Sequence, residues 1–164
     1  MLERLRHKMP SEAKRRVVIA LVSAEDLSAW SDASFDGVNI LLALFAMADP
    51  RAALAYAMRL LRPGGVFVAT EPKRSFDMKT LLTHAEQWLR SQGLYDRLRA
   101  DWQRVCEINR KIDPGARRSA FTIENIYPLL ADRGFQILSL RDSHHGNCAT
   151  VVARKGVAGG SSQR

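Results

Sequence analysis

The chain has 164 residues, of which 46% are hydrophobic, and this length and composition fit one globular domain with its own core. Its formal net charge is +8. Its longest apolar run, Ile40–Ala48, is far shorter than the ~20 residues of a membrane-spanning helix, and no apolar stretch follows the basic Met1–Met9 segment, so neither a membrane span nor a secretory signal is predicted. Cys106 and Cys148 are too few for a disulfide framework and lack metal-ligand spacing, which predicts a reduced, cytoplasmic protein with no bound metal.

Two runs in the middle of the chain, 38–47 and 66–69, are almost entirely apolar. Such runs are typical of strands that helices cover on both faces of a sheet. We therefore predict strands near 36–44 and 65–70.

The residues between these runs have the pattern of a helix. Asp49 can cap its start. Pro50 can occupy the first helical position, because the backbone N–H of a residue there has no partner within the helix, so proline loses nothing by lacking it. Apolar residues then recur at helical spacing until the Pro63–Gly65 turn. A helix over 50–61 would join the two strands, which are then expected to be parallel.

In these residues the chain resembles the class I methyltransferases that use S-adenosylmethionine, and within them the type 11 small-molecule branch. The shared features are Phe35-Asp36 before the first strand, Asp49-Pro50 at the helix start, the Leu-Arg-Pro-Gly-Gly sequence of 61–65, and Glu71-Pro72 after the second strand. The combination is specific, although each half alone would be weak.

The resemblance extends to the rest of the chain and implies an α/β fold. Residues 1–10 match the end of a helix, and 17–22 match a strand. Downstream, 122–134 match the last helix of the family, and 135–141 and 147–154 match its closing antiparallel strand pair. We therefore predict an incomplete doubly wound, Rossmann-like sheet, mostly parallel, with helices on both faces and an antiparallel C-terminal strand pair.

About fifty residues after the second strand exceed what a minimal sheet of this kind needs. They show two amphipathic patterns, which predict helices over 78–92 and 94–112. Since an apolar stripe requires a docking surface, and since insertions at this point often cover the substrate pocket in the family, we expect a cover over the C-terminal ends of the strands. Trp88 and Trp102 should be at least partly buried beneath it.

The resemblance also shows what this sequence lacks. The family binds its cofactor on a Gly-rich turn between its first strand and helix, where the backbone can approach the ligand closely. No G-x-G occurs in the chain, and only sixteen residues precede Val17. We therefore interpret 1–155 as a single truncated methyltransferase-like domain, and the Gly-Gly-Ser-Ser region of 156–164 as a flexible tail.

The remaining cofactor positions are implied by the resemblance alone. They lie in two loops, one beside the adenine and one beside the methionine portion of S-adenosylmethionine. The predicted binding residues are Ser23, Ala24, Glu25 and Asp26 in the first loop, and Leu41, Leu42 and Ala43 in the second. Ser23 stands where the family usually has an aspartate. Without the Gly-rich turn, the two loops make half a site.

Candidate catalytic residues are few. Methyl transfer mainly requires alignment of the reactants, and it requires a base only when the acceptor carries a proton. Glu71 follows a strand at the edge where open α/β sheets bind ligands. His144 and His145 lie in the turn between the last two strands, where the alternative is an ordinary solvated histidine. His84, on the predicted 78–92 helix, is expected to be structural.

The positive charge comes mainly from two regions, 1–16 and 97–118. Basic regions can bind nucleic acid, but no stacking platform or known binding motif accompanies these charges, so we expect solvated helix faces instead.

Two classes of function remain open from the sequence. The first is the C-terminal part of a methyltransferase that acts on a small-molecule acceptor and is inactive or weakly active as this chain alone. The second is a non-catalytic remnant that serves as a partner subunit or a basic binding module. Because two strand edges would be unpaired, a homo-oligomer or pairing with a missing N-terminal segment is expected in either case.

Overall fold

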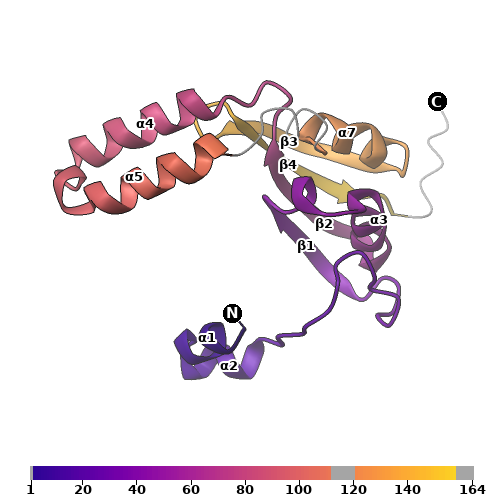
Figure 1. Ribbon diagram of the computed structural model, residues 1–164. Helices are drawn as coiled ribbons and strands as arrows, with labels where there is room; N and C mark the ends of the chain where they lie inside the picture. The colour runs from indigo at the N-terminus through magenta and orange to yellow at the C-terminus, as the bar shows by residue number, and fades with distance from the viewer. Residues whose placement is uncertain (1, 112–120, 158–164) are drawn as a thin grey trace.

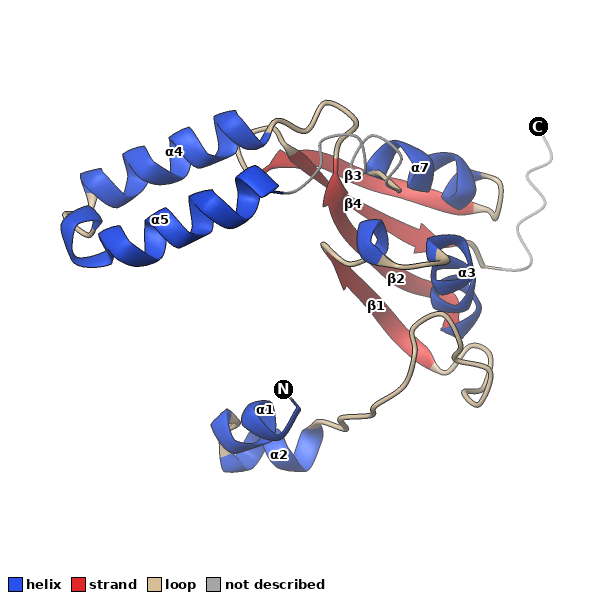
Figure 2. Cartoon of the chain, viewed as in Figure 1, coloured by secondary structure: helices blue, strands red, loops and turns tan. Residues whose placement is uncertain are grey.

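A computed structural model describes residues 2–111 and 121–157 of the chain, shown along the sequence in Figure 1 and by secondary structure in Figure 2. The elements are α1 (Leu2–Lys8), α2 (Ser11–Arg16), β1 (Phe35–Leu41), the 3₁₀ turn η1 (Leu44–Ala46), α3 (Pro50–Leu60), β2 (Leu61–Pro72), α4 (Met78–Ser91), α5 (Tyr95–Lys111), α7 (Ile123–Ala131), β3 (Phe135–Ser143) and β4 (Cys148–Lys155).

The strands form one four-stranded sheet in the order β1-β2-β4-β3. β1 and β2 are parallel and are joined by α3, whereas β4 is antiparallel to both β2 and β3. The predicted β-α-β unit and the predicted antiparallel C-terminal pair are therefore confirmed. The sheet is not mostly parallel, because β1 and β2 form its one parallel pair among the described residues.

Helix α3 begins and ends as its sequence indicates. The Asp49 Oδ1 atom accepts a hydrogen bond from the Ala52 N–H at 2.9 Å, so this side chain caps the start of the helix. At the other end, the Lys155 ammonium donates to the carbonyl oxygens of Met58 and Leu61 at 2.8 and 2.6 Å. A cation there satisfies carbonyl groups that the helix leaves unpaired.

β2 begins at Leu61, four residues earlier than predicted. Phe35 of β1 pairs with Leu61, and Gly37 already pairs with Val66, so an irregularity in the ladder takes up the extra residues of β2. Gly65 lies inside it, where a Cβ atom would come within 3.0 Å of the Asp36 carbonyl oxygen. The glycine that was expected to end the helix therefore allows β1 and β2 to approach closely.

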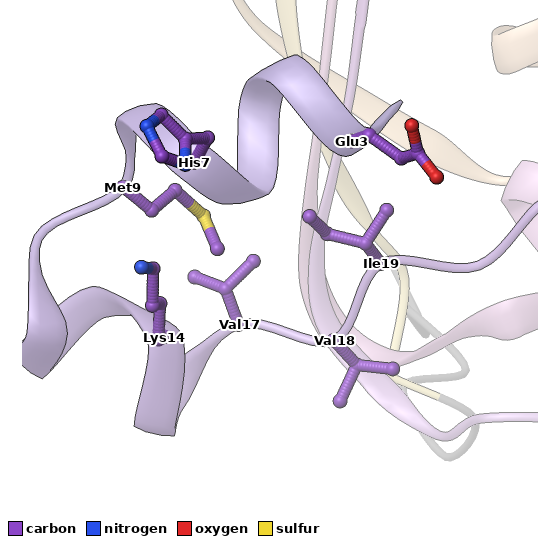
Figure 3. Close-up of a pocket in the computed structure, with 7 residues that line it drawn as sticks. All are labelled: Glu3, His7, Met9, Lys14, Val17, Val18 and Ile19. Atoms are coloured by element: carbon purple, nitrogen blue, oxygen red, sulfur yellow. The ribbon is translucent and has the colours of Figure 1, made fainter. Parts of the chain in front are cut away.

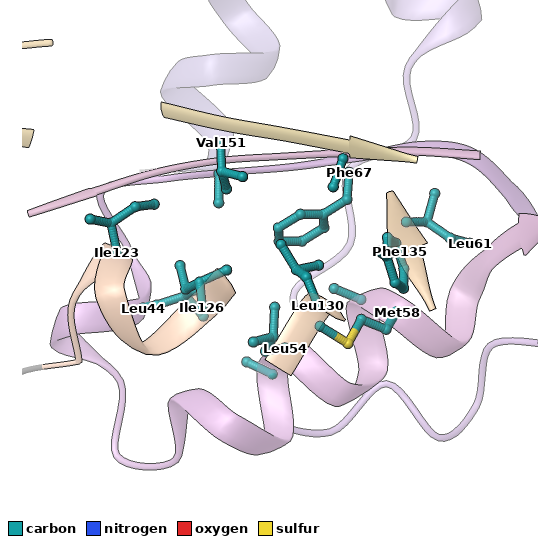
Figure 4. Packing of buried hydrophobic residues seen from close by; sticks show 14 of the residues in the cluster. Leu44, Leu54, Met58, Leu61, Phe67, Ile123, Ile126, Leu130, Phe135 and Val151 are labelled. Carbon is teal, nitrogen blue, oxygen red and sulfur yellow. The ribbon is translucent and has the colours of Figure 1, made fainter. Parts of the chain in front are cut away.

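The hydrophobic core lies between the sheet and two helices on the same face, α3 and α7 (Figure 4). Phe67 and Val151 point from the sheet toward Leu54 of α3 and Ile126 of α7, and all four side chains are fully buried. Within residues 2–111 and 121–157, no other α-helix contributes a side chain to this core. The expected helical layer on the second face is thus not formed by the described residues.

The predicted strand over 17–22 is also absent. These residues form no strand, and Val18 and Leu21 are 86% and 88% exposed. A strand needs hydrogen-bonding partners on a neighbouring strand, and the segment instead leaves α2 as a connection that lies apart from the sheet (Figure 1).

Helices α4 and α5 form at the predicted positions but do not cover the sheet. They lie side by side as a hairpin that projects away from the strands (Figure 2), and neither helix has a buried residue. Trp88 is 57% exposed, whereas Trp102 is half-buried and donates its Nε1–H to Glu86 at 3.1 Å. The apolar stripes of α4 and α5 partly cover each other, so the hairpin does not need the strands as a docking surface.

No helix among residues 2–111 and 121–157 is long and apolar enough to cross a membrane. Of the predicted tail, Gly156 and Val157 are described, and 158–164 lie outside the described residues. The end of the predicted 94–112 helix falls at the start of 112–120, which is likewise outside them.

Candidate functional site

The loop that follows β1 is held by the carboxylate of Glu71, near the end of β2. Its Oε1 atom accepts hydrogen bonds from the N–H groups of Ala43 and Leu44 at 3.0 and 2.9 Å, and Oε2 accepts from the Phe45 N–H at 3.4 Å. Glu71 is fully buried. Two of these N–H groups, those of Leu44 and Phe45, belong to η1. The carboxylate therefore caps the start of η1, although it belongs to β2.

Burial raises the pKa of the Glu71 carboxyl, and the N–H groups of Leu44, Ala43 and Phe45 oppose that rise. The pKa of the Cys148 thiol is also raised, first by burial and then by the negative charge of Glu71. Both oxygens of Glu71 face backbone donors and its side chain is fully buried, so this carboxyl holds the 43–45 loop, and its role as a base stays a prediction.

The clamped loop presents apolar side chains at the carboxyl end of β1. Leu42 has a positive φ of 48°, which is uncommon for leucine, and its N–H donates to the Thr70 carbonyl oxygen at 2.8 Å. Leu41 and Leu42 are 58% and 40% exposed, and Ala43 is half-buried. This backbone conformation turns the chain away from the strand and leaves the two leucines accessible to a ligand or a partner.

The other predicted loop lies beside the start of α3. The Glu25 Oε1 atom accepts from the Asp49 N–H at 2.7 Å, and the Ser23 Oγ atom accepts from the Glu25 N–H at 3.1 Å. Ala24 is exposed. Since α3 starts where the chain returns from β1, the hydrogen bond of Glu25 places the 23–26 loop at the same edge of the sheet as Leu41–Ala43.

Asp26 is engaged locally. Its Oδ1 atom accepts from the N–H and the hydroxyl of Ser28 at 3.1 and 2.7 Å, and the Tyr56 hydroxyl lies 3.5 Å away. The two hydrogen bonds from Ser28 lower the pKa of Asp26. Asp26 is exposed and stays ionised near neutral pH, so it remains available as an acceptor for a polar ligand group.

Arg59 of α3 fastens the rest of this loop. Its guanidinium donates to the carbonyl oxygens of Leu27 and Trp30 at 2.8 and 2.9 Å and pairs with Asp32. Sequence reasoning did not find this clamp, because nothing in the spacing of Arg59 indicates that its partners lie about thirty residues earlier.

Replacing Arg59 by methionine should remove this clamp but retain the apolar stem. We expect a loss of about 2 kcal/mol of unfolding free energy, since hydrogen bonds to charged groups contribute roughly 1.5–3 kcal/mol and part of this side chain is solvated. Arg62→Met is the matched control, because the ion pair that Arg62 forms within the described residues is with the exposed Asp36. Urea denaturation measures both variants, and equal stability of the two would contradict the clamp.

The β3–β4 turn carries the two other candidate bases. His144 and His145 both have positive φ, and the Gly146 N–H closes the turn on the Ser143 carbonyl oxygen at 3.0 Å. His144 is exposed, and its Nδ1 lies 3.1 Å from the Ser143 hydroxyl. The His145 ring stacks on His84 of α4 with centroids 4.4 Å apart. No hydrogen bond joins either turn histidine to Glu71 in the described chain, and the role of each residue as a base stays a prediction.

Asn147, which the sequence did not single out, connects this turn to the hairpin. Its Oδ1 atom accepts from the Asp77 N–H at 2.6 Å, and its carbonyl oxygen accepts from the Lys73 N–H at 2.9 Å. The side chain is almost fully buried. Asp77 in turn caps α4 through the Lys79 N–H at 3.0 Å, so Asn147 positions the start of the hairpin.

A wide hollow of about 750 Å³ lies elsewhere, between α1, α2 and the connection that follows (Figure 3). Its lining residues are Glu3, His7, Met9, Lys14, Val17, Val18 and Ile19. None of the predicted site residues borders it.

The four-stranded mixed sheet, with both predicted loops at the carboxyl edge of its parallel pair, is an α/β fold of the methyltransferase type. Residues 1–69 match the family model of the methyltransferase domain, type 11. The resemblance inferred from the sequence is thereby confirmed for this part of the chain. A search of curated proteins found no match.

Comparison with solved structures extends the likeness of fold to most of the chain. The [4+2]-cyclase SpnF superimposes with a TM-score of 0.58 at 17% identity, over 96% of this chain and 61% of that one. A SAM-dependent methyltransferase from Aquifex aeolicus gives a TM-score of 0.56 at 11% identity, over 93% of this chain and 60% of that one. The chain therefore spans about three fifths of the length of these relatives.

Proposed function

We propose that this chain is the C-terminal part of a methyltransferase that uses S-adenosylmethionine and acts on a small-molecule acceptor in the cytoplasm, and that it has little or no activity alone. The observation that carries the proposal is the placement of the two loops. Glu25 bonds to the start of α3, and Glu71 holds the loop after β1, so both loops lie at one edge of the sheet.

The residues present fit part of the cofactor. Leu41 and Leu42 offer exposed apolar surface for the ligand, and the ionised Asp26 offers a hydrogen-bond acceptor. No Gly-rich turn occurs in the sequence, and the Glu71 carboxylate is occupied by backbone N–H groups. Because the site is partial, we derive no step of methyl transfer from it.

The alternative is a non-catalytic methyltransferase-like protein that serves as a partner subunit or a basic binding module. Two observations favour keeping it. Glu71 is buried and both of its oxygens accept from backbone N–H groups, and a protein named a [4+2]-cyclase shares the fold, so the fold itself does not imply methyl transfer.

Isothermal titration calorimetry of the purified chain with S-adenosylmethionine tests the proposed partial site. Losing several polar contacts, at roughly 1–3 kcal/mol each, moves a micromolar dissociation constant to about millimolar or weaker. We therefore expect no saturable binding at micromolar cofactor. A micromolar constant for this chain would contradict the proposal.

Reading the coding sequence upstream in the same frame separates the two functions. A preceding strand and G-x-G turn would support the methyltransferase, and extending the chain to include them should then restore micromolar binding. An in-frame stop with no such segment nearby would favour the non-catalytic protein.

A further inference from the structure

A small hollow lies beside the last turns of α3, away from the two predicted cofactor loops. It has a volume of about 240 Å³, is here called the α3 hollow, and is lined by Ala55, Met58, Arg59, Arg133, Phe135 and Lys155. Asp49 caps α3 at the loop edge of the sheet, and Met58 lies near the other end of the helix. At about 1.5 Å of rise per residue, the hollow is roughly 14 Å from that edge, so it is separate from the candidate cofactor site.

The buried part of the lining is apolar, and the accessible part is cationic. Met58 and Phe135, both labelled in Figure 4, are 3% and 6% exposed. Arg133 is exposed and Lys155 is half-buried, so each can lay its aliphatic stem along the apolar surface and keep its charge accessible. A surface of this kind suits a molecule with a charged end and an apolar body.

Two cations from different parts of the chain meet at Met58. The Arg133 guanidinium, from the loop between α7 and β3, donates to the Met58 sulfur at 3.3 Å. The Lys155 ammonium, at the end of β4, donates to the carbonyl oxygens of Met58 and Leu61 at 2.8 and 2.6 Å. A thioether is a weak acceptor and both carbonyls are neutral, so these contacts leave the two positive charges unbalanced.

No carboxylate among the described residues neutralises these two cations. Arg59, the third cation of the lining, pairs with Asp32, whereas neither Arg133 nor Lys155 forms an ion pair within 2–111 and 121–157. Asp132 is exposed and does not pair with the neighbouring Arg133. A guanidinium has further N–H groups beyond the one used here, and an ammonium has one beyond the two used here, so donors remain for an anion.

We propose that the α3 hollow binds a small organic anion, with a carboxylate or phosphate group carried on a short apolar body. The anionic group accepts charge-assisted hydrogen bonds from Arg133 and Lys155, and the apolar body lies against Met58 and Phe135. The volume is below the roughly 300–1,000 Å³ of pockets for drug-sized ligands, so the ligand is small. This site is independent of the proposed cofactor site, since no residue is shared between them.

An NMR titration of the full chain, labelled at its methionine methyl groups, tests the proposal with phenyl phosphate and benzoate as probes. We expect the Met58 methyl resonance to shift saturably at about millimolar probe. The tighter of the two probes identifies the preferred anionic group. Inorganic phosphate lacks the apolar body and should bind about tenfold more weakly or worse, and benzyl alcohol lacks the charge and should give no saturable shift.

A pair of charge-matched variants makes the assignment specific. Arg133→Met should weaken binding of the tighter probe by about tenfold, because it removes a charged donor from the hollow. Arg154→Met is the control, since Arg154 is exposed and adjacent residues of a strand point to opposite faces of the sheet, which separates its side chain from that of Lys155. Unchanged resonances of the other methionine methyls show that both variants fold.

Several outcomes would overturn the proposal. The first is a Met58 methyl that does not shift with either probe up to its solubility limit. The second is equal loss of binding, or no loss, in Arg133→Met and Arg154→Met. The third is equal affinity for inorganic phosphate and for phenyl phosphate, or saturable binding of benzyl alcohol, because the hollow would then not recognise the combination of charge and apolar body.

Discussion

Replacing Glu71 by alanine is expected to be among the most destabilising single changes in this protein. The substitution leaves the N–H groups of Ala43, Leu44 and Phe45 without their acceptor, in a place that is buried at Leu44 and partly buried at the other two residues. A buried donor left unsatisfied costs about 1–3 kcal/mol, so a total loss of about 3–5 kcal/mol follows after water partly replaces the carboxylate. At roughly 2–4 °C per kcal/mol for a chain of this size, Tm should fall by about 10 °C.

Calorimetry measures this change, and hydrogen exchange of the 43–45 amides should accelerate with it. Glu86→Ala is the control, because Glu86 is a carboxylate on α4 whose partners Arg90 and Trp102 reach solvent or lie half-buried. Normal exchange at 43–45 in the Glu71 variant would show that η1 forms without its cap.

The same residue should produce a specific pH dependence. Its pKa is raised above the reference value of 4.5, mainly by burial, so the folded state binds a proton more readily than the unfolded state does. The stability that Glu71 contributes is then fully present below pH 4.5 and declines as pH rises through the folded pKa. The difference in unfolding free energy between wild type and Glu71→Gln should therefore shrink from pH 4.5 upward. A difference that grows with pH would mean that the three N–H donors outweigh burial.

Replacing Phe67 by alanine is expected to cost about 3–5 kcal/mol, the usual range for a buried phenylalanine. Phe67 is fully buried at the centre of β2, and its ring meets Phe135 edge to face with centroids 6.4 Å apart. Side chains of α3 and α7 pack on the same ring (Figure 4). The cavity left by the Phe67→Ala substitution would therefore be lined from several sides and could not collapse easily.

Urea denaturation compares Phe67→Ala with Phe45→Ala. Phe45 is 41% exposed, so its truncation removes fewer contacts and should cost less than about 1 kcal/mol. Because domains are stable by only about 5–15 kcal/mol, the Phe67 variant should be partly unfolded at moderate urea where the control is native. Equal urea midpoints for the Phe67→Ala and Phe45→Ala variants would contradict the central position of Phe67 in the core.

The β-α-β unit could be predicted from residue patterns in the sequence, whereas the closing strand pair was implied by the resemblance to the methyltransferase family. In the helix between β1 and β2, every signal is local: Asp49 caps Ala52 three residues later, and the buried residues recur one turn apart. Hydrogen bonds and contacts of this range depend on neighbours along the chain, so composition and spacing are sufficient to predict them.

Which groups contact the candidate site residues depends on the tertiary structure. Glu71 was predicted as a base from its position after a strand, but the loop that folds over it supplies three N–H donors from residues 26–28 positions earlier. The same is true of Arg59, whose partners belong to a loop about thirty residues away. No sequence pattern indicates which loop will pass over a given side chain.

Residues 17–22 show the same limit for secondary structure. They have the composition of a strand, and β-branched residues favour that state, yet they form no strand in the described chain. A helix satisfies its hydrogen bonds within itself, so its sequence can determine it. A strand exists only when a second strand lies beside it, so its formation depends on the partner that the tertiary structure, or another chain, provides.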